Sequence, residues 1–247
     1  MNTDVQVLIL AAGKGSRMGG ELPKALTLLD GKPMVHHLLE SIKKFSQIKP
    51  ITVIGYKGDM VKESLAGASI YALQEEQKGT GHAVMSAREQ LLESPCPYVA
   101  ILNADQPLIS ENTLNQFSNI LNKGSKFVIA TSNIADDNLF ENYFKFLGRI
   151  DRNESGTIRR IIESKDANQK ELEIREISPA FFCLEKKWLL EKLDFIGNNN
   201  TQGEYYITDL ISLAFNEGIT IESVQVSELE ALGANSLDQL ELLESYL

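Results

Sequence analysis

The chain has 247 residues, of which 43% are hydrophobic and 23% are charged, as in an ordinary globular protein. Its 34 acidic and 24 basic side chains give a net charge of −10, which repels nucleic acids and anionic membranes, so we expect neither as a partner. No signal peptide, membrane span or cysteine motif is visible, and this predicts a protein of the reducing cytoplasm.

The first half of the chain alternates predicted strands and helices. Continuous apolar runs indicate buried strands at 5–10, 51–56, 69–73, 98–102 and 126–131. Apolar residues at helical spacing, or a capping serine, indicate helices at 33–45, 80–92 and 110–121. This alternation predicts a parallel, doubly wound α/β sheet.

The second half is richer in turns. Two strands at 148–152 and 157–163 are expected to form a hairpin around the polar cluster 153–156. Further strands are expected at 177–184 and 219–226, and helices at 187–193, 209–215 and 236–246. Residues 136–138 and 198–200 are interpreted as polar loops. We expect one domain, 1–247, with a β-rich lobe at about 134–185.

A glycine-containing motif, LAAGKGSRM, follows the first strand, with Lys24 a few residues later. Glycines at 13 and 15 let backbone amides approach a phosphate, and successive amides form an anion-binding nest. Arg17 and Lys24 add the positive charge that a triphosphate needs during transfer. The sequence contains no Walker pattern, GxxxxGK followed by serine or threonine. The loop also differs from the dinucleotide-binding fingerprint GxGxxG, because Met18 stands in place of the third glycine.

Two further motifs follow predicted strands. Gln74 offers an amide to a base edge, and Gly79 with Thr80 stands at a helix start, where free amides face a ligand. Asp105, in Asn103-Ala104-Asp105, lies at the carboxyl end of a buried strand, where a carboxylate can bind Mg²⁺ beside a phosphate. Taken singly, each motif also fits an ordinary turn or capped helix.

Several stretches together resemble a known family. LAAGKGSRM, LPKAL, QKGTGHAV, GRI, IESKDA and NNNTQGEYYITDLI occur in order along essentially the whole chain. They are similar to the N-terminal half of the bacterial bifunctional N-acetylglucosamine-1-phosphate uridylyltransferases. The resemblance implies a Rossmann-like nucleotidyltransferase fold, a mixed sheet with helices on both faces and a small β-rich sugar-binding lobe. It also implies Mg²⁺-assisted transfer from UTP to N-acetylglucosamine 1-phosphate, with release of pyrophosphate.

The family's second half, a hexapeptide-repeat β-helix, has no counterpart in the 247 residues. Acetyl transfer is therefore not expected. The oligomeric state, which that half governs in the family, is left open. A nucleoside triphosphate and a sugar 1-phosphate are the implied small-molecule partners.

The resemblance also carries residue roles over by position. Catalytic groups acting on the phosphates would be Arg17 and Lys24. Nucleotide contacts would be Leu10, Ala11, Ala12, Gly13, Gln74, Gly79, Thr80, Asn103 and Asp105. Sugar contacts would be Gly148, Glu163, Ser178 and Tyr206, and the Mg²⁺ ligands Asp105 and Asn235.

Three departures from the family lie on the sugar side. Ser178-Pro179-Ala180 replaces Asn-Thr-Gly, Asn103-Ala104 replaces Tyr-Gly, and residues 136–146 replace a short Gly-Tyr turn. They leave open a nucleotidyltransferase of the same fold that uses another sugar 1-phosphate or nucleotide. The stretch NADQP at 103–107 is also similar to cofactor cytidylyl- and guanylyltransferases. A nucleotide-sugar-binding module without turnover is the alternative from another class.

Overall fold

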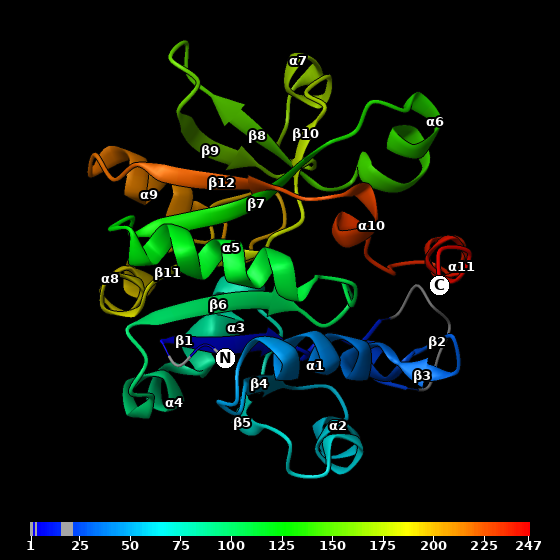
Figure 1. Cartoon of the computed structure of the whole chain (residues 1–247). Helices are drawn as coiled ribbons and strands as arrows, with labels where there is room; N and C mark the ends of the chain where they lie inside the picture. Colours follow the sequence, from blue (N-terminus) through cyan, green and yellow to red (C-terminus); the bar gives the residue numbers. More distant parts are fainter. Residues whose placement is uncertain (1, 3, 16–21) are drawn as a thin grey trace.

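The computed structural model describes residues 2, 4–15 and 22–247, and these are arranged around a mixed β-sheet (Figure 1). The sheet order is β5 (Ile70–Leu73), β4 (Ile51–Ile54), β1 (Val5–Leu10), β6 (Tyr98–Asn103), β11 (Phe182–Glu185), β7 (Phe127–Asn133), β10 (Glu176–Ser178), β8 (Gly148–Arg152) and β9 (Ile158–Ile162). The strand β12 (Ile221–Gln225) pairs with β7, and β2 (Leu28–Leu29) pairs with β3 (Lys32–Pro33).

Helices cover both faces of this sheet, as expected for buried strands. The α-helices are α1 (Met34–Phe45), α2 (Gly58–Leu65), α3 (Thr80–Ser86), α4 (Arg88–Glu93), α5 (Glu111–Asn122), α6 (Asp137–Leu139), α7 (Gln169–Leu172), α8 (Lys186–Lys192), α9 (Asp209–Asn216), α10 (Glu228–Ala231) and α11 (Leu237–Glu244). Shorter turns are the 3-10 helices η2 (Lys24–Leu26) and η4 (Leu193–Phe195) and the π-helix η3 (Phe140–Phe144).

The strands contribute side chains to two hydrophobic cores. In β1, Val5, Val7 and Ile9 belong to the core beneath α1 and α5, and Leu8 belongs to the core beneath α3, α8 and α9. This alternation follows the period of two along a strand, and it is why the residues of β1 are apolar except for Gln6. In Figure 1, α1 and α5 lie in front of the sheet.

The strand direction changes at the middle of the sheet. Strands β5, β4, β1 and β6 are parallel, whereas β11 runs antiparallel to both of its neighbours, β6 and β7. The strands of the first half therefore share one direction, as the βα alternation predicts, and the antiparallel β11 of the second half gives the mixed sheet that the family resemblance implies. The physical reason is that β11 follows β10, which also runs antiparallel to β7, and residues 179–181 join the two strands without a crossover helix.

Two predicted elements are interrupted in the structure. The helix expected at 80–92 breaks at Ala87, whose φ and ψ of −98° and 10° are not helical. The strand expected at 177–184 is divided by residues 179–181, where Pro179 offers no amide for the ladder and Ala180 has a positive φ of 56°. The helix α2, which sequence reasoning did not predict, begins just after Lys57.

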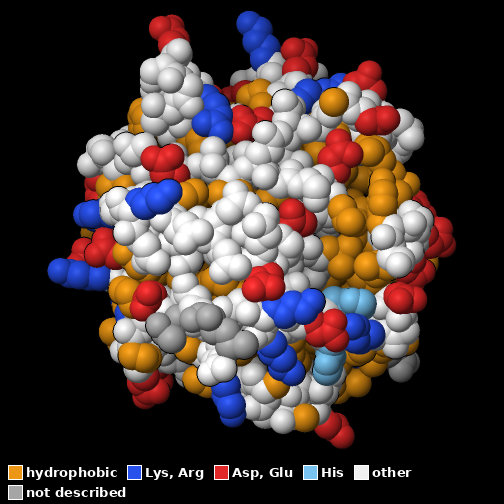
Figure 2. Space-filling view, in the orientation of Figure 1, with side chains coloured by type: hydrophobic (Ala, Val, Ile, Leu, Met, Phe, Trp, Pro, Cys, Tyr) orange, Lys and Arg blue, Asp and Glu red, His pale blue; other side chains and the backbone are white. Residues whose placement is uncertain are grey.

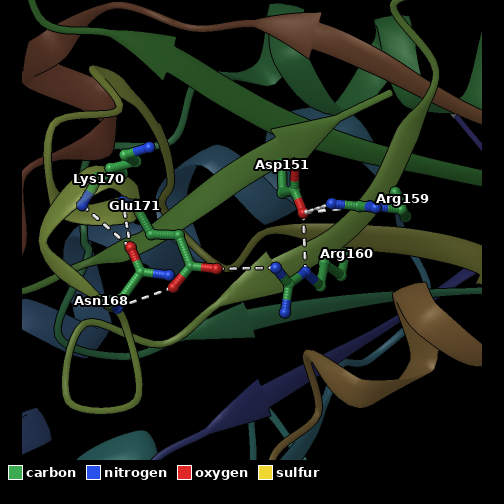
Figure 3. Close-up of polar contacts among 6 residues, drawn as sticks. All are labelled: Asp151, Arg159, Arg160, Asn168, Lys170 and Glu171. Carbon is green, nitrogen blue, oxygen red and sulfur yellow. Dashed lines mark hydrogen bonds and ion pairs between the residues drawn. The ribbon is translucent and has the colours of Figure 1, made fainter. Parts of the chain in front are cut away.

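The loop predicted at 136–138 is also wrong, because these residues begin the helical segment α6–η3. Asp136 caps this segment by accepting a hydrogen bond from the Leu139 amide at 2.8 Å. In the same outer region, charged side chains brace the β8–β9 hairpin against α7 (Figure 3). Arg160 donates to Asp151 at 2.7 Å and to Glu171 at 2.8 Å.

Acidic and basic side chains are interspersed over the face shown in Figure 2. Across residues 2, 4–15 and 22–247, none of the helices has the length and apolar character needed to cross a membrane.

Candidate active site

A cavity of about 450 Å³ opens at the carboxyl ends of β1 and β6. This is the sheet edge where ligands bind in open α/β folds. The structure brings most of the predicted site residues together in its lining: Leu10, Ala11, Ala12, Gly13, Lys24, Gln74, Gly79, Thr80, Asn103, Asp105, Gly148, Glu163, Ser178 and Asn235.

The register of β1 and β6 sets the centre of this cavity. Leu10 pairs with Asn103, and the Ala104 amide continues the ladder to the Leu10 carbonyl at 3.0 Å. Because the two strands are parallel, the loop after β1 and the carboxylate of Asp105 leave the sheet side by side.

The loop after β1 depends on glycine. Gly15 has a φ of +68°, and a Cβ there would lie 2.9 Å from the Cβ of Lys24, so a side chain is excluded. At Gly13 an added Cβ would meet no protein atom within 4 Å. The amide of Ala11 already donates to the Val53 carbonyl at 2.9 Å. Any phosphate contacts of this loop would therefore be made by amides that follow Ala11 in the chain. Arg17 lies outside the described residues.

The ammonium of Lys24 joins the two predicted metal ligands. It forms a salt bridge with the Asp105 carboxylate and donates to the Asn235 side-chain carbonyl at 2.5 Å. All three side chains are partly shielded, and those of Lys24 and Asp105 are 16% and 24% exposed. Residues from three distant parts of the chain therefore converge on one position, and that position attracts a cation.

Backbone hydrogen bonds hold Asn235 in place. The amide of Ala234 donates to the Asp105 carbonyl at 2.9 Å, and the amide of Asn235 donates to the Gln239 side chain at 2.7 Å. Gly233 is required in this turn because a Cβ would lie 2.9 Å from the Gln106 side chain. The GAN sequence at 233–235 is thus built to present an amide oxygen beside Asp105.

This pair of oxygen donors fits a hard divalent cation. A carboxylate and an amide oxygen are ligands that Mg²⁺ accepts, and the ion ordinarily completes its octahedron with water and substrate phosphates. The Lys24 ammonium shows that a positive charge is stable between them. Within the described ranges no group of three or more His, Cys, Asp or Glu could hold a metal by itself. The pair therefore suits a metal that arrives with phosphate.

The predicted base side is formed where two sequence motifs dock on each other. Gly79, at φ +103°, packs so closely against Tyr205 that a Cβ would lie 2.6 Å from the Tyr205 carbonyl. The Thr80 hydroxyl accepts from the Ile207 amide at 3.1 Å. The side chain of Gln74 is 3% exposed and donates to the Gly79 carbonyl at 3.1 Å. The stretch 204–207 therefore fixes the turn at 78–81.

On the predicted sugar side, Gly148 and Glu163 lie opposite the phosphate loop. A Cβ at Gly148 would lie 2.6 Å from the Ile161 side chain, so glycine alone fits there. Glu163 accepts a hydrogen bond from the Thr208 hydroxyl at 2.9 Å. Burial raises the pKa of the Glu163 carboxyl above its ordinary value, the hydrogen bond opposes this, and neighbouring carboxylates raise it further. Glu163 is thus suited to hydrogen bonding with a sugar hydroxyl.

The segment Ser178–Ala180 also lines the cavity. The Ser178 hydroxyl accepts from the Ala180 amide at 3.1 Å, so it bonds its own turn. Ala180 has a φ of 56°, a left-handed conformation that favours glycine. Tyr206 lies outside the lining and accepts from the Gln202 side chain at 2.8 Å. Its assignment as a sugar contact stays a prediction.

Some lining residues were not among the predicted site residues. Thr208 and Glu204 belong to the long motif QGEYYITD, so the sequence alone could have indicated them as site residues. Gln106 follows Asp105 directly and accepts from the Asn103 side chain at 3.1 Å. Gln77 also lines the cavity, and because it begins the stretch QKGTGHAV, the sequence could have indicated it as well.

The described part of the lining carries one ammonium, Lys24, and three carboxylates, Asp105, Glu163 and Glu204. A triphosphate would add further negative charge. Its binding in this cavity therefore requires a cation beyond Lys24, which a divalent metal can supply.

Comparison with known proteins agrees with this geometry. The model of the MobA-like NTP transferase domain matches residues 7–173. The chain belongs to this family. Among curated relatives, this MobA-like domain is 44% identical to the Bifunctional protein GlmU of Clostridium acetobutylicum over 94% of the chain and 50% of the relative. It is 39% identical to the Bifunctional protein GlmU of Enterococcus faecalis, over 92% of this chain and 48% of that relative. The chain thus spans about half the length of the curated relatives it matches.

Solved structures show the same fold. A UDP-glucose pyrophosphorylase complexed with UDP-glucose superposes with a TM-score of 0.76, covering 98% of this chain and 97% of that chain at 19% identity. The 4-diphosphocytidyl-2C-methyl-D-erythritol synthase of Anaerococcus prevotii gives a TM-score of 0.67 at 14% identity, with 98% of this chain and 97% of that chain covered. At these identities the likeness shows the nucleotidyltransferase fold.

Proposed function

We propose that the chain is a sugar-1-phosphate nucleotidyltransferase that makes UDP-N-acetylglucosamine and pyrophosphate from UTP and N-acetylglucosamine 1-phosphate. The observation that carries the proposal is the convergence of Lys24, Asp105 and Asn235 on one cation position beside the loop after β1. The relatives at 44% and 39% identity, both named as GlmU, support uridylyl transfer within this fold.

In the proposed reaction, a phosphate oxygen of the sugar 1-phosphate attacks the α-phosphorus of UTP in line. The new P–O bond forms as the bond from the α-phosphorus to the bridging α–β oxygen breaks. Pyrophosphate leaves with that electron pair. The attacking phosphate oxygen is already ionised and pyrophosphate leaves as an anion, so the chain needs no general base, and positioning with charge stabilisation accounts for catalysis.

Each part of the cavity has a task in this scheme. Asp105 and Asn235 would hold Mg²⁺, which when bound neutralises negative charge on the reacting phosphates. Lys24, and Arg17 from outside the described residues, would stabilise the charge that develops on pyrophosphate. Gln74 would select the base, and Glu163, oriented by Thr208, would bind a sugar hydroxyl.

The direct test is pyrophosphate release from a matrix of the four ribonucleoside triphosphates and a set of sugar 1-phosphates. The proposal expects UTP with N-acetylglucosamine 1-phosphate among the productive pairs. Turnover should be lost in Asp105→Ala. Thermal stabilisation by UDP-N-acetylglucosamine without pyrophosphate release from any pair would instead favour a nucleotide-sugar-binding module.

The second candidate is a nucleotidyltransferase of the same fold with a different acceptor. The turn at Ser178–Ala180 favours it, because the serine hydroxyl is bound to the Ala180 amide, whereas the family's asparagine contacts the sugar. In the same matrix this candidate predicts UTP turnover with another sugar 1-phosphate and little with N-acetylglucosamine 1-phosphate.

A further inference from the structure

A second cavity, of about 280 Å³, adjoins the sugar side of the first. The two cavities share Leu147, Glu163 and Asn235 in their linings. Glu163 is the predicted sugar contact, so the second cavity lies next to the position of the acceptor sugar. None of the predicted nucleotide contacts lines the second cavity.

One wall of this cavity is the segment 136–147, in the region where the chain departs most from its family. Long-range contacts fix this wall. Phe140 packs between two guanidinium groups, 4.9 Å from that of Arg149 and 4.1 Å from that of Arg175. Arg149 is 1% exposed and donates to the carbonyls of Leu147 and Lys145, the latter at 2.9 Å. The wall is therefore built into the fold.

The opposite wall is tied to this segment. The Ser164 hydroxyl donates to the Phe146 carbonyl at 2.9 Å. Lys165 lies next to Ser164, and its ammonium is hydrogen-bonded to the Gln202 side chain. The cavity is thus held open between two connected walls.

The lining has the chemistry of a site for a neutral polar group. Phe146, 61% exposed, offers an aromatic face, and Lys165 and Glu163 are the charged residues among the described lining. The other polar side chains carry amides or hydroxyls: Asn142, Tyr143, Ser164, Gln202, Ser236 and Gln239. Such groups hydrogen-bond hydroxyls and amides without requiring charge on the ligand.

We propose that this second cavity receives a neutral, hydroxyl- or amide-rich extension of the acceptor, so that the preferred substrate is a sugar 1-phosphate larger than N-acetylglucosamine 1-phosphate. The inference rests on the proposed function, whose acceptor class it narrows. The extension is either a second sugar ring or an acylamino substituent on the first.

Kinetics with four acceptors at saturating UTP test the proposal. They are N-acetylglucosamine 1-phosphate, N,N′-diacetylchitobiose 1-phosphate, a 2,4-diacetamido-hexose 1-phosphate, and the anionic N-acetylmuramic acid 1-phosphate. We expect kcat/KM for one of the two neutral extended acceptors to exceed that for N-acetylglucosamine 1-phosphate by about tenfold. Which one does so identifies the source of the extension. Equal or lower values for both, or a preference for the anionic acceptor, would overturn the inference.

A variant that fills the second cavity gives an independent test. Asn142 is exposed and lines this cavity, whereas its neighbour Glu141 is exposed and does not. Asn142→Trp should raise KM for the extended acceptor by about tenfold and leave that for N-acetylglucosamine 1-phosphate within about twofold. Glu141→Trp adds the same bulk and should change neither. Equal effects of the two variants on both acceptors would contradict the subsite.

Calorimetric binding of the same four compounds to the protein with UTP separates this inference from the proposed function. If no pair releases pyrophosphate, nucleotidyl transfer fails. Tighter binding of a neutral extended acceptor, weakened by Asn142→Trp, would then still support the subsite. If N-acetylglucosamine 1-phosphate turns over but neither extended acceptor binds more tightly, the subsite alone is wrong.

Discussion

Asp105 and Asn235 share one hydrogen-bond donor, the ammonium of Lys24. The two oxygen ligands proposed for Mg²⁺ are therefore held together by a cation of the protein itself. A metal ion entering this position must displace the ammonium, which then becomes free to reach a phosphate. Lys24 should accordingly weaken metal binding in the free protein while it assists transfer.

Lys24→Met removes the charge and keeps a chain of similar shape. Because nothing then competes for the two oxygens, Mn²⁺ should bind the free protein about tenfold more tightly, measured by electron paramagnetic resonance. Turnover should fall about 100-fold or more, since a charge at the transition state is lost. Lys14→Met is the control for metal affinity, because the Lys14 ammonium lies over the Tyr56 ring and away from Asp105. Unchanged Mn²⁺ affinity in Lys24→Met would rule out competition.

Asp105→Ala and Asn235→Ala should each lower kcat about 100-fold or more, because each removes a ligand that stabilises charge on the reacting phosphates. The double variant should lose much less than the product of the single losses. Two residues that hold the same ion act as a unit, and their effects are not additive. Steady-state kinetics of the wild type, the two single variants and the double variant measures kcat for this double-mutant cycle. Fully multiplicative losses would mean that the two residues do not share an ion.

Glu163→Gln should stabilise the protein at neutral pH. The pKa of Glu163 is raised in the folded state, chiefly by burial, so the folded chain holds a proton that the unfolded chain releases. The wild-type protein therefore loses stability as the pH rises from the ordinary carboxyl pKa through the raised one. The Tm of the variant should exceed that of the wild type by about 2 °C or more at neutral pH, and the difference should vanish below about pH 4.

Thermal unfolding of both proteins from pH 4 to pH 8 measures this difference. Glutamine can still accept the Thr208 hydrogen bond, so the local structure is kept. Glu171→Gln, on α7, is a useful contrast, because Glu171 accepts from Arg160 and its loss should lower stability. A Tm difference for Glu163→Gln that is constant with pH would contradict the assigned protonation.

Ala180→Gly should raise Tm by about 2–4 °C, because a left-handed alanine costs about 1–2 kcal/mol and glycine removes most of that strain. Ala66, at the end of α2, has a similar φ of 46° and lies outside the cavity lining. Ala66→Gly should give a comparable rise in Tm by the same mechanism. Kinetics distinguishes the two, since only Ala180→Gly should change KM for the sugar 1-phosphate. A shift in KM in both variants, or in neither, would show that Ala180 does not shape the acceptor side.

Sequence reasoning predicted the central part of the site because few physical rules position it. Parallel strands place their carboxyl ends together, and this is sufficient to bring the loop after Leu10 to Asp105. Asn235 was assigned by resemblance, since no local pattern links it to Asp105. The structure supplies that link through the Ala234 amide and the Asp105 carbonyl.

The sugar side was less predictable because tertiary contacts determine it. Residues 136–138 look like a polar loop, yet they begin a helical segment whose Phe140 packs against Arg149 on β8 and Arg175 just before β10. The contacts of Phe140 leave no periodic signal in the sequence. The break at residues 179–181 does have a local signal in Pro179, but the positive φ of Ala180 has none.

The antiparallel strand β11 has a consequence for how this protein could diversify. It begins two residues after Ala180 and pairs Phe182 with Ile101, two positions before Asn103 on β6. Backbone adjustments that accommodate a new acceptor at Ser178–Ala180 therefore transmit directly to the strand that presents Asp105. The helical segment at 136–147 reaches the same centre by a longer route, because Gln239 donates to the Tyr143 carbonyl at 3.1 Å and accepts from the Asn235 amide at 2.7 Å. Changes of acceptor choice by either route are therefore expected to affect the groups that carry the reaction.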